Sequence, residues 1–442
     1  MTKVITYGTY DHLHHGHVRL LERAKSLGDY LIVGVTADGF DMARGKINVQ
    51  QSLMERIEAV RQTGLADQII IEEYEGQKID DIRKYGVDIF TVGSDWVGKF
   101  DYLNEFCKVI YLDRTLGVSS TEIRSSKNEL RLGLIGETAI LTKFKNECKY
   151  VNGVRVVGAF STSCEQLDDE LQGLCNGITS IEDLMSGCNA LYIASNPTLH
   201  YMQCKRALEA GLHVLCESPV TLNENEYKSL ADIAGEKGLV LMDGLKTAYS
   251  LAYNRLILQV KSGIIGDILS VDTTCTSLVD FAKYGDKLPP YIWNSITGWG
   301  PTALLPILDI FGTDFKSLEL VSRYLKSDPD FDIFTKGSLM YCNGVASFKV
   351  GKGVKSEGEM IISGTKGYIY VPAPWWKTDY FEVRYENPAE NKRYFFQLEG
   401  EGIRYEILSF LHQIEGIASA NRISPAVSEC IIRILDSRAE AI

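Results

Sequence analysis

Four of the seven histidines lie within the first seventeen residues, and three of them belong to the run His14-His-Gly-His17. This run follows an apolar stretch at 4–7 and opens a stretch with helical spacing, so it marks a strand-to-helix turn. The first N–H groups of a helix point toward a bound anion, the helix dipole favours negative charge, and His14 and His17 can lie over it. Gly16 leaves the backbone of the turn bare. The turn therefore predicts a phosphate-binding site.

The chemistry that suits such a turn is nucleotidyl transfer, in which a nucleophile attacks the α-phosphorus of a nucleoside triphosphate and pyrophosphate leaves. The protein has to place the reacting groups and neutralise the charge that builds up in the transition state. A phosphate nucleophile is already ionised, so no general base is required. We expect His14 and His17 to be catalytic.

A second segment, Asp113–Arg124, follows an apolar run and opens another helical stretch. Arg114 can hold a phosphate through two hydrogen bonds, so it is the third expected catalytic residue. Ser119, Ser120 and Thr121 offer hydroxyls and helix-start N–H groups. The same residues are also ordinary helix-capping chemistry, but together with the histidine turn they favour phosphate binding.

The elements that must position these residues alternate between strand and helix over the first 126 residues. Apolar runs of strand type at 4–7, 30–35, 68–71, 89–92 and 109–112 are separated by helical stretches, which predicts a parallel α/β sheet. The pattern restarts at 131, after a polar stretch. From about 267 it becomes period-two, which predicts an antiparallel sheet, followed by two closing helices. We expect an α/β protein with a nucleotidyltransferase domain at 1–126, a linker at 127–130, a second Rossmann-like domain at 131–246, and an antiparallel-sheet domain at 247–442.

Composition limits the classes of partner. The formal net charge of −12 argues against nucleic acid and against an anionic membrane, because both require a basic surface. The ten cysteines form no Cys-x-x-Cys pair, no signal sequence precedes the first residues, and no apolar run approaches the roughly eighteen residues that span a bilayer. We expect a reduced, cytoplasmic protein that forms a homodimer or a larger homo-oligomer.

Five stretches of the first domain carry a family resemblance: Thr6–Asp11, His14–His17, Leu20–Lys25, Gly93–Asp101 and Arg114–Thr121. Together they resemble the glycerol-3-phosphate cytidylyltransferases over the whole of residues 1–126. The resemblance implies that Arg44 and Lys78 hold the glycerol phosphate and that Mg²⁺ takes part, with Asp11 as the nearest carboxylate. It implies a CTP site formed by Thr9, Tyr10, His14, Gly16, His17, Lys46, Arg114, Thr115, Gly117, Ser119, Ser120 and Thr121.

Three positions depart from that family. Arg44 stands where the family usually has Lys, Ser94 where it has Asp, and Glu75 near a usual Trp. Arg44 keeps its charge but presents a wider fork. These changes do not determine which phosphorylated alcohol receives the CMP group. We expect sn-glycerol 3-phosphate first, and the alternatives are glycerol 2-phosphate, a polyol phosphate and phosphoethanolamine.

Residues 131–442 contain other signals: the strand and turn at 131–136, then Ala194–His200, Ala210–Pro219 and Gly263–Ile268. They resemble the glucose–fructose oxidoreductase/inositol dehydrogenase-like (Gfo/Idh/MocA) family. The resemblance implies a Rossmann half followed by an open antiparallel sheet.

The residues expected of a working dehydrogenase are replaced. Thr138 stands where a dinucleotide-binding turn has its second glycine, and Glu137 brings negative charge beside it. The second strand ends at Phe160 with no carboxylate for the ribose, and Ser218 replaces the family's catalytic lysine. Lys246 and Tyr249 could form a replacement acid pair for the missing lysine, although such a Lys-Tyr pair more commonly lies at the edge of the core.

We therefore expect residues 131–442 to perform no NAD(P)-dependent redox turnover, with NAD(P) absent or held without catalysis. The leading function is synthesis of CDP-glycerol for a capsule, teichoic acid or other surface glycan. Two alternatives assign a role to the whole chain. One is a bifunctional cytidylyltransferase and reductase, and the other is a non-catalytic regulatory or scaffold protein.

Overall fold

The structure is a computed structural model whose described residues are 1–11, 13, 15–37, 51, 53–74, 76–113, 129–137, 140–284, 288–289, 292–396, 398, 400–416, 423–437 and 440–441. They divide into two compact units. The first unit holds residues 1–129 with 150–153, and the second holds 130–149 with 154–442. His14, Arg44, Lys46 and Arg114–Thr121 lie outside the described residues.

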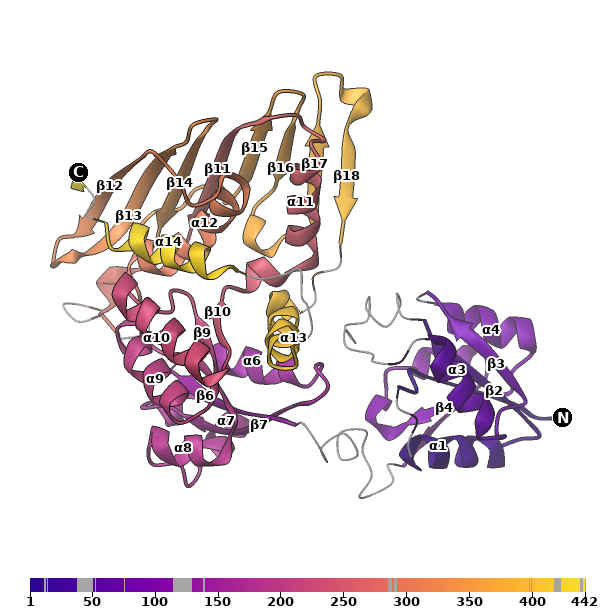
Figure 1. Cartoon of the computed structure of the whole chain (residues 1–442). Coiled ribbons are helices and arrows are strands. Elements are labelled where there is room, and N and C mark those ends of the chain that lie inside the picture. Colours follow the sequence, from indigo (N-terminus) through magenta and orange to yellow (C-terminus); the bar gives the residue numbers. More distant parts are fainter. Residues whose placement is uncertain are drawn as a thin grey trace. The chain divides into compact units, whose positions relative to one another are not determined.

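Within the described part of the first unit, five parallel strands form a sheet in the order β3-β2-β1-β4-β5 (Figure 1). The apolar runs predicted the strands to within a residue at each end, because parallel strands covered by helices read as nearly continuous apolar runs. The strands are β1 (Lys3–Gly8), β2 (Tyr30–Thr36), β3 (Gln68–Glu72), β4 (Ile89–Gly93) and β5 (Lys108–Leu112), and the helices are α1 (His15–Ser26), α3 (Leu53–Gln62), α4 (Gln77–Tyr85), η1 (Ser94–Trp96) and η2 (Asp101–Glu105).

Side chains of neighbouring residues leave this sheet on opposite faces. Val4 of β1 packs into a cluster with Leu21 of α1, whereas Ile5 packs into another with Phe90 and Ile82. The two clusters fix α1 and α3 on one face and α4 on the other. The start of α1 is thereby held at the end of β1, where the histidine turn was predicted.

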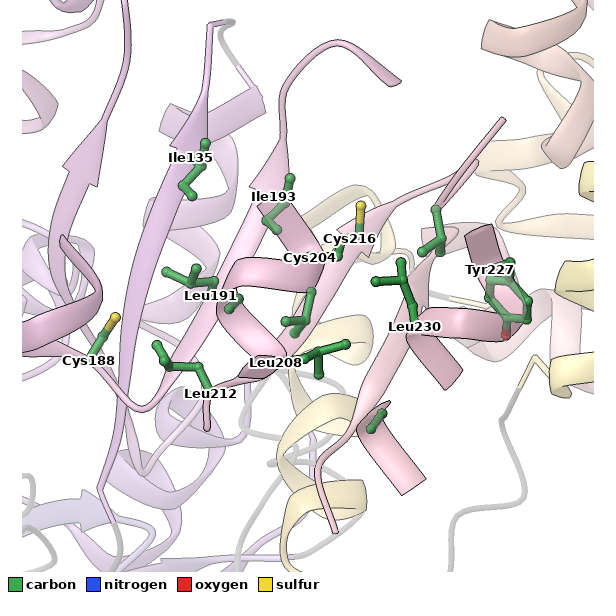
Figure 2. Packing of buried hydrophobic residues seen from close by; sticks show 14 of the residues in the cluster. Ile135, Cys188, Leu191, Ile193, Cys204, Leu208, Leu212, Cys216, Tyr227 and Leu230 are labelled. Atoms are coloured by element: carbon green, nitrogen blue, oxygen red, sulfur yellow. The ribbon is translucent and has the colours of Figure 1, made fainter. Parts of the chain in front are cut away.

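The second unit begins with another parallel sheet, in the order β10-β9-β8-β6-β7 for the residues described. Leu191 and Ile193 of β8 pack against Cys204 and Leu208 of α9 (Figure 2). Its elements are β6 (Leu130–Gly136), α6 (Ile140–Cys148), β7 (Val154–Phe160), η3 (Cys164–Gln166), α7 (Asp169–Cys175), α8 (Ile181–Gly187), β8 (Ala190–Ala194), α9 (Pro197–Glu209), β9 (His213–Glu217), α10 (Glu224–Lys237) and β10 (Leu241–Gly244).

A second sheet follows, and its nine described strands run in the order β18-β17-β16-β15-β11-β14-β13-β12-β19 (Figure 1). Neighbours are antiparallel except for β11 with β14 and β12 with β19. The strands are β11 (Ile268–Thr276), β12 (Ser317–Leu325), β13 (Asp328–Met340), β14 (Val345–Gly351), β15 (Met360–Gly364), β16 (Tyr368–Val371), β17 (Tyr380–Arg384), β18 (Lys392–Phe395) and β19 (Glu440–Ala441). The fold class expected from the sequence, two parallel sheets and a mostly antiparallel one, is confirmed.

The last helices of the chain pack back onto the Rossmann half. Helix α13 (Ile403–Ile414) contacts α6, and the buried Arg404 forms an ion pair with Glu147 at 2.7 Å. Helix α14 (Pro425–Leu435) contacts α10 and also α12 (Ser295–Phe311), which lies against the large sheet. The remaining helical segments are η4 (Lys246–Tyr249), α11 (Leu251–Lys261), η5 (Phe281–Tyr284), η6 (Trp375–Lys377), η7 (Pro388–Glu390) and η8 (Gly400–Gly402). No helix among the described residues is long and apolar enough to cross a membrane.

Candidate active sites in the two units

The strand order of the first sheet puts its topological switch point at the carboxyl ends of β1 and β4. From β1 the chain proceeds outward to β2 and β3, and β4 and β5 are then added on the other side. The connections after β1 and β4 therefore leave in opposite directions, and open α/β sheets bind ligands at this switch point. The expected residues Thr9, Tyr10, Gly16 and His17 all belong to the connection after β1 and the first turn of α1.

Tyr10 has an uncommon backbone conformation, with φ of 55°, and its side chain is buried. A side chain on Gly8 would lie 3.0 Å from the Tyr10 ring, so the glycine makes room for it. The Tyr10 ring meets the His17 imidazole edge-on, with 5.5 Å between ring centroids. A left-handed non-glycine residue costs about 1–3 kcal/mol and persists only where its surroundings enforce it. The tyrosine thus fixes the orientation of His17.

Arg56 of α3 connects the ends of three segments. It is fully buried, its Nη1 donates to the carbonyls of Thr9 (2.7 Å) and Thr36 (2.8 Å), and its Nε donates to the carbonyl of Gln51 (3.1 Å). These carbonyls belong to the loop after β1, the end of β2 and the approach to α3. Arg56 therefore sets the position of the predicted CTP-binding turn without being part of it.

Asp11, the expected metal-binding residue, is buried, and its Oδ1 accepts a hydrogen bond from the backbone N–H of Gln51 at 3.0 Å. Among the residues that the structure describes, no three His, Cys, Asp or Glu side chains gather in a way that could hold a metal ion. Mg²⁺ usually keeps several waters and takes one or two protein carboxylates beside substrate phosphates. The Asp11 carboxylate joins the loop after β1 to the approach to α3, and its role toward Mg²⁺ stays a prediction.

Lys78, expected to bind the acceptor phosphate, is buried and forms an ion pair with Glu72 at the end of β3. Its ammonium also lies 4.7 Å from the centroid of the Tyr7 ring. Glu72 in turn accepts a hydrogen bond from Thr36 at 2.9 Å. Lys78 thus belongs to a buried network beneath the carboxyl edge of the sheet.

The remaining expected residues of this site lie outside the described part of the chain. The approach to the second phosphate-binding segment is nevertheless fixed, because Arg23 of α1 donates to the carbonyl of Asp113 at 2.6 Å. The undescribed site residues are His14, Arg44, Lys46, Arg114, Thr115, Gly117, Ser119, Ser120 and Thr121.

The second unit contains a cleft between its Rossmann half and its large sheet. Two cavities of about 250 and 300 Å³ share Glu217, Trp293, Gly298 and Trp299 as lining residues, so they form parts of one cleft. Burial raises the pKa of the Glu217 carboxyl, which also accepts a hydrogen bond from Tyr192. The smaller cavity is also lined by Lys352, whose pKa burial lowers to about 8. Groups that can exchange protons therefore border the cleft.

Glu137 follows β6 and lines the smaller cavity. Its carboxylate accepts from the N–H of Thr162 at 3.1 Å, from the Thr162 hydroxyl at 2.8 Å and from the Ser161 hydroxyl at 3.3 Å. These contacts hold it at the end of β7, so the expectation that it opposes a pyrophosphate in the turn is not supported. A carboxylate at the end of the second strand is what dinucleotide-binding folds use for ribose hydroxyls. Thr138 lies outside the described residues.

Ser218 lines the larger cavity together with Lys246. Tyr249, in contrast, is buried, and its hydroxyl donates to the Asp243 carbonyl at 2.8 Å. The two candidates for a replacement acid therefore differ in position. Tyr249 lies in the core, which is the commoner place for such a residue, whereas Lys246 lines the cleft.

Comparison with known proteins agrees with the geometry of the first unit. A family model described as cytidylyltransferase-like matches residues 5–126. The glycerol-3-phosphate cytidylyltransferase of Bacillus spizizenii is 48% identical over 130 residues, which are 29% of this chain and 100% of that protein. That of Staphylococcus aureus is 47% identical over 128 residues, 28% of this chain and 93% of that protein. This chain belongs to the glycerol-3-phosphate cytidylyltransferase family.

Its cytidylyltransferase domain is fused to a Gfo/Idh/MocA oxidoreductase domain. A model described as oxidoreductase family, NAD-binding Rossmann fold, matches residues 130–245. A 3-ketoreductase from Actinomadura kijaniata, solved with NADP and TDP-benzene, superposes with a TM-score of 0.62 at 16% identity, over 71% of this chain and 99% of that chain. The latter likeness shows the fold alone. The family match does not support our expectation that NAD(P) binding and redox chemistry are absent.

Two structural roles in this cytidylyltransferase were not predicted from sequence. One is the support that Arg56 gives to the loop after β1, and the other is the position of the Glu137 carboxylate at the end of β7. Arg56 carries no motif, because its partners are backbone carbonyls far along the chain. Glu137 was noticed, but its direction depends on Ser161 and Thr162, which only the parallel pairing of β6 with β7 brings near. The sequence shows the polar residues after β6 and after β7, but it does not show that the two segments lie side by side.

Proposed function

We propose that the first unit transfers CMP from CTP to sn-glycerol 3-phosphate, giving CDP-glycerol and pyrophosphate. The observation that carries the proposal is the 48% identity over the entire length of a glycerol-3-phosphate cytidylyltransferase. The geometry supports it, because Thr9, Tyr10 and His17 meet at the switch point of the sheet. The product would supply glycerol phosphate units for a capsule, a teichoic acid or another surface glycan.

In this proposal the phosphate oxygen of the acceptor attacks the α-phosphorus of CTP, and the bond to pyrophosphate breaks. The N–H groups at the start of α1, with His17 and His14, stabilise negative charge on the triphosphate. Arg114 and the hydroxyls of 119–121 would contribute further hydrogen bonds to it. Mg²⁺ would neutralise further charge on the triphosphate, with Asp11 as its proposed protein ligand.

The direct test measures pyrophosphate release by the full-length protein with CTP and a panel of acceptors. The panel contains sn-glycerol 3-phosphate, glycerol 2-phosphate, a polyol phosphate and phosphoethanolamine. The highest kcat/KM is expected for sn-glycerol 3-phosphate. A clear preference for another acceptor would support cytidylyl transfer but change the proposed acceptor. No pyrophosphate release with any acceptor would refute the proposal.

Arg44 is proposed to bind the acceptor and not CTP. Replacing it by alanine should raise the KM for glycerol 3-phosphate by about tenfold or more, since a charged hydrogen bond contributes about 1.5–3 kcal/mol. The KM for CTP should change much less. Steady-state kinetics with each substrate varied separately decide the matter, and a larger effect on CTP would reassign the residue.

We propose a second candidate function, NAD(P)-dependent reduction or oxidation, for the second unit, as in a bifunctional enzyme. Its support is the oxidoreductase-family match over 130–245 together with the cleft that Glu137, Glu217 and Lys352 border. A nicotinamide cofactor would supply or accept the hydride. Glu137 would hold its adenosine ribose, and Lys352, which lines the same cavity, would take the place of the missing lysine.

The carboxylate of Glu137 should make the second unit prefer NADH to NADPH. It would accept hydrogen bonds from ribose hydroxyls but repel a 2′-phosphate. Replacing Glu137 by alanine should weaken NADH binding by about tenfold and abolish the preference. Quenching of protein fluorescence by each cofactor measures this without turnover. Glu182→Ala, which removes an exposed ion pair between α8 and α9, is the control, and an unchanged preference in Glu137→Ala would disprove the assignment.

A further inference from the structure

One carboxylate in the cleft of the second unit contacts three lysines from separate elements. Glu401 lies 3.1 Å from Lys143 of α6, 3.4 Å from Lys246 of η4 and 2.9 Å from Lys377 of η6. All four line the cavity of about 300 Å³ together with Ser218. We call these four residues the lysine cluster. Because its members are far apart in the sequence, only the folded cleft brings them together.

The backbone delivers Glu401 to the lysines in a conformation that side chains rarely adopt. Gly400, Glu401 and Gly402 have φ values of 56°, 55° and 90°. Such a residue other than glycine costs about 1–3 kcal/mol, so neighbouring contacts must hold it. A side chain on Gly400 would come within 1.8 Å of Glu147, which is itself fixed by Arg404. The turn is thus built to point a carboxylate at three ammonium groups.

The charges in the cluster do not balance. Burial acts to raise the pKa of Glu401, but the three lysines outweigh it and lower the pKa to about 2, so the side chain carries one full negative charge. Glu217 and Glu406 also lie near Lys246, and burial raises the pKa of both. Within the cluster itself, three ammonium groups contact the one carboxylate of Glu401.

A dianionic group would satisfy three ammonium groups better than a single carboxylate does. The cavity is at the small end of the range for ligand sites, which is about 300–1,000 Å³. Its walls include the Trp299 and Trp376 rings, whose centroids are 4.9 Å apart and which can cover a short carbon chain. A small phosphorylated metabolite fits this combination of charge, size and surface.

We propose that Lys143, Lys246 and Lys377 bind the phosphate group of a small phosphorylated alcohol or carbonyl compound, and that Glu401 occupies this position until the ligand displaces it. The proposal deepens the second candidate function and rests on it for the substrate role, since the ligand's carbon chain would then lie beside Ser218. Binding itself needs neither cofactor nor turnover.

Tryptophan fluorescence of the full-length protein provides the test. Four of the five tryptophans, residues 293, 299, 375 and 376, lie in the second unit, and Trp96→Phe removes the fifth. In this background the emission should respond to glycerol 3-phosphate and to inorganic phosphate, and not to glycerol. Glu401→Gln, which removes the competing charge, should tighten both by about tenfold, and Lys377→Met should weaken both by at least as much. Lys228→Met, at an exposed ion pair with Glu224 and Glu429, should change nothing.

Unchanged or weaker phosphate binding by a folded Glu401→Gln protein would overturn the proposal, and so would an equal response to glycerol. A response abolished by Lys228→Met as much as by Lys377→Met would also overturn it, because binding would then be nonspecific. The outcome is separate from that of the redox hypothesis. If phosphate binds as expected and no NAD(P)H is consumed with any carbonyl compound, the phosphate site stands and the redox function fails.

Discussion

Replacing His17 by alanine is expected to lower CTP-dependent pyrophosphate release by two orders of magnitude or more while leaving the fold intact. His17 lies in the first turn of α1, at the switch point of the sheet, and its ring is oriented by Tyr10. Removing one preorganised group that stabilises charge in a transition state typically costs about 3–4 kcal/mol. The effect should appear mainly in kcat, because the charge to be stabilised is largest in the transition state.

His15 is the matched control for this experiment. It occupies the same turn, but it is exposed and accepts a hydrogen bond from Arg19 at 3.0 Å. His15→Ala should retain turnover within a few-fold of the wild type. Circular dichroism and thermal melting check that both variants are folded. Near-normal turnover in a folded His17→Ala protein would remove the phosphate role that we assign to the turn.

The second large effect is expected from Arg56→Met. The arginine is fully buried and donates three hydrogen bonds to backbone carbonyls, which methionine cannot replace. A hydrogen bond from a charged donor contributes about 1.5–3 kcal/mol, and buried carbonyls left without partners add to the cost. The free energy of unfolding of the first unit should fall by about 3 kcal/mol or more. CTP turnover should also fall, because the turn with Thr9 loses its support.

Arg61→Met provides the comparison on the same helix. Arg61 is exposed and is paired with Glu58 three residues earlier. Its replacement should change the free energy of unfolding by about 0.5 kcal/mol or less. Urea denaturation of the two variants, followed by circular dichroism, measures the difference. Equal stability of the two variants would show that the buried network does not support the first unit as we infer.

The central strands of the first parallel sheet could be predicted from sequence because they are buried on both faces. The predicted runs at 30–35 and 89–92 begin at the first residues of β2 and β4 and end one residue before their last. Strands β12 and β18 were not anticipated, since exposed residues interrupt their apolar pattern, and in β17 the pattern is interrupted by the buried Glu382. Helix α12 was missed for a different reason. It contains Pro301 and Pro306, which usually end a helix, and only burial against the large sheet keeps it continuous.

The candidate sites show the same division. Motifs at contiguous positions, such as the histidine turn, were recognised because their chemistry is local. The lysine cluster could not be, because Lys143 and Glu401 are separated by more than half the chain and meet only where α6 and η8 border one cavity. Charge in the sequence does not reveal which distant partner will neutralise it.

The packing of α13 on α6 has a consequence for how the protein is made. The sheet of the first unit has all its strands once Leu112 has left the ribosome. Helix α6, in contrast, waits for a partner about 260 residues further along, and Glu147 waits for Arg404. At about 5–20 residues per second this delay lasts for tens of seconds or less, during which the apolar face of α6 needs protection. A premature stop codon between the two helices should therefore spare cytidylyl transfer and leave the oxidoreductase half to aggregate or be degraded.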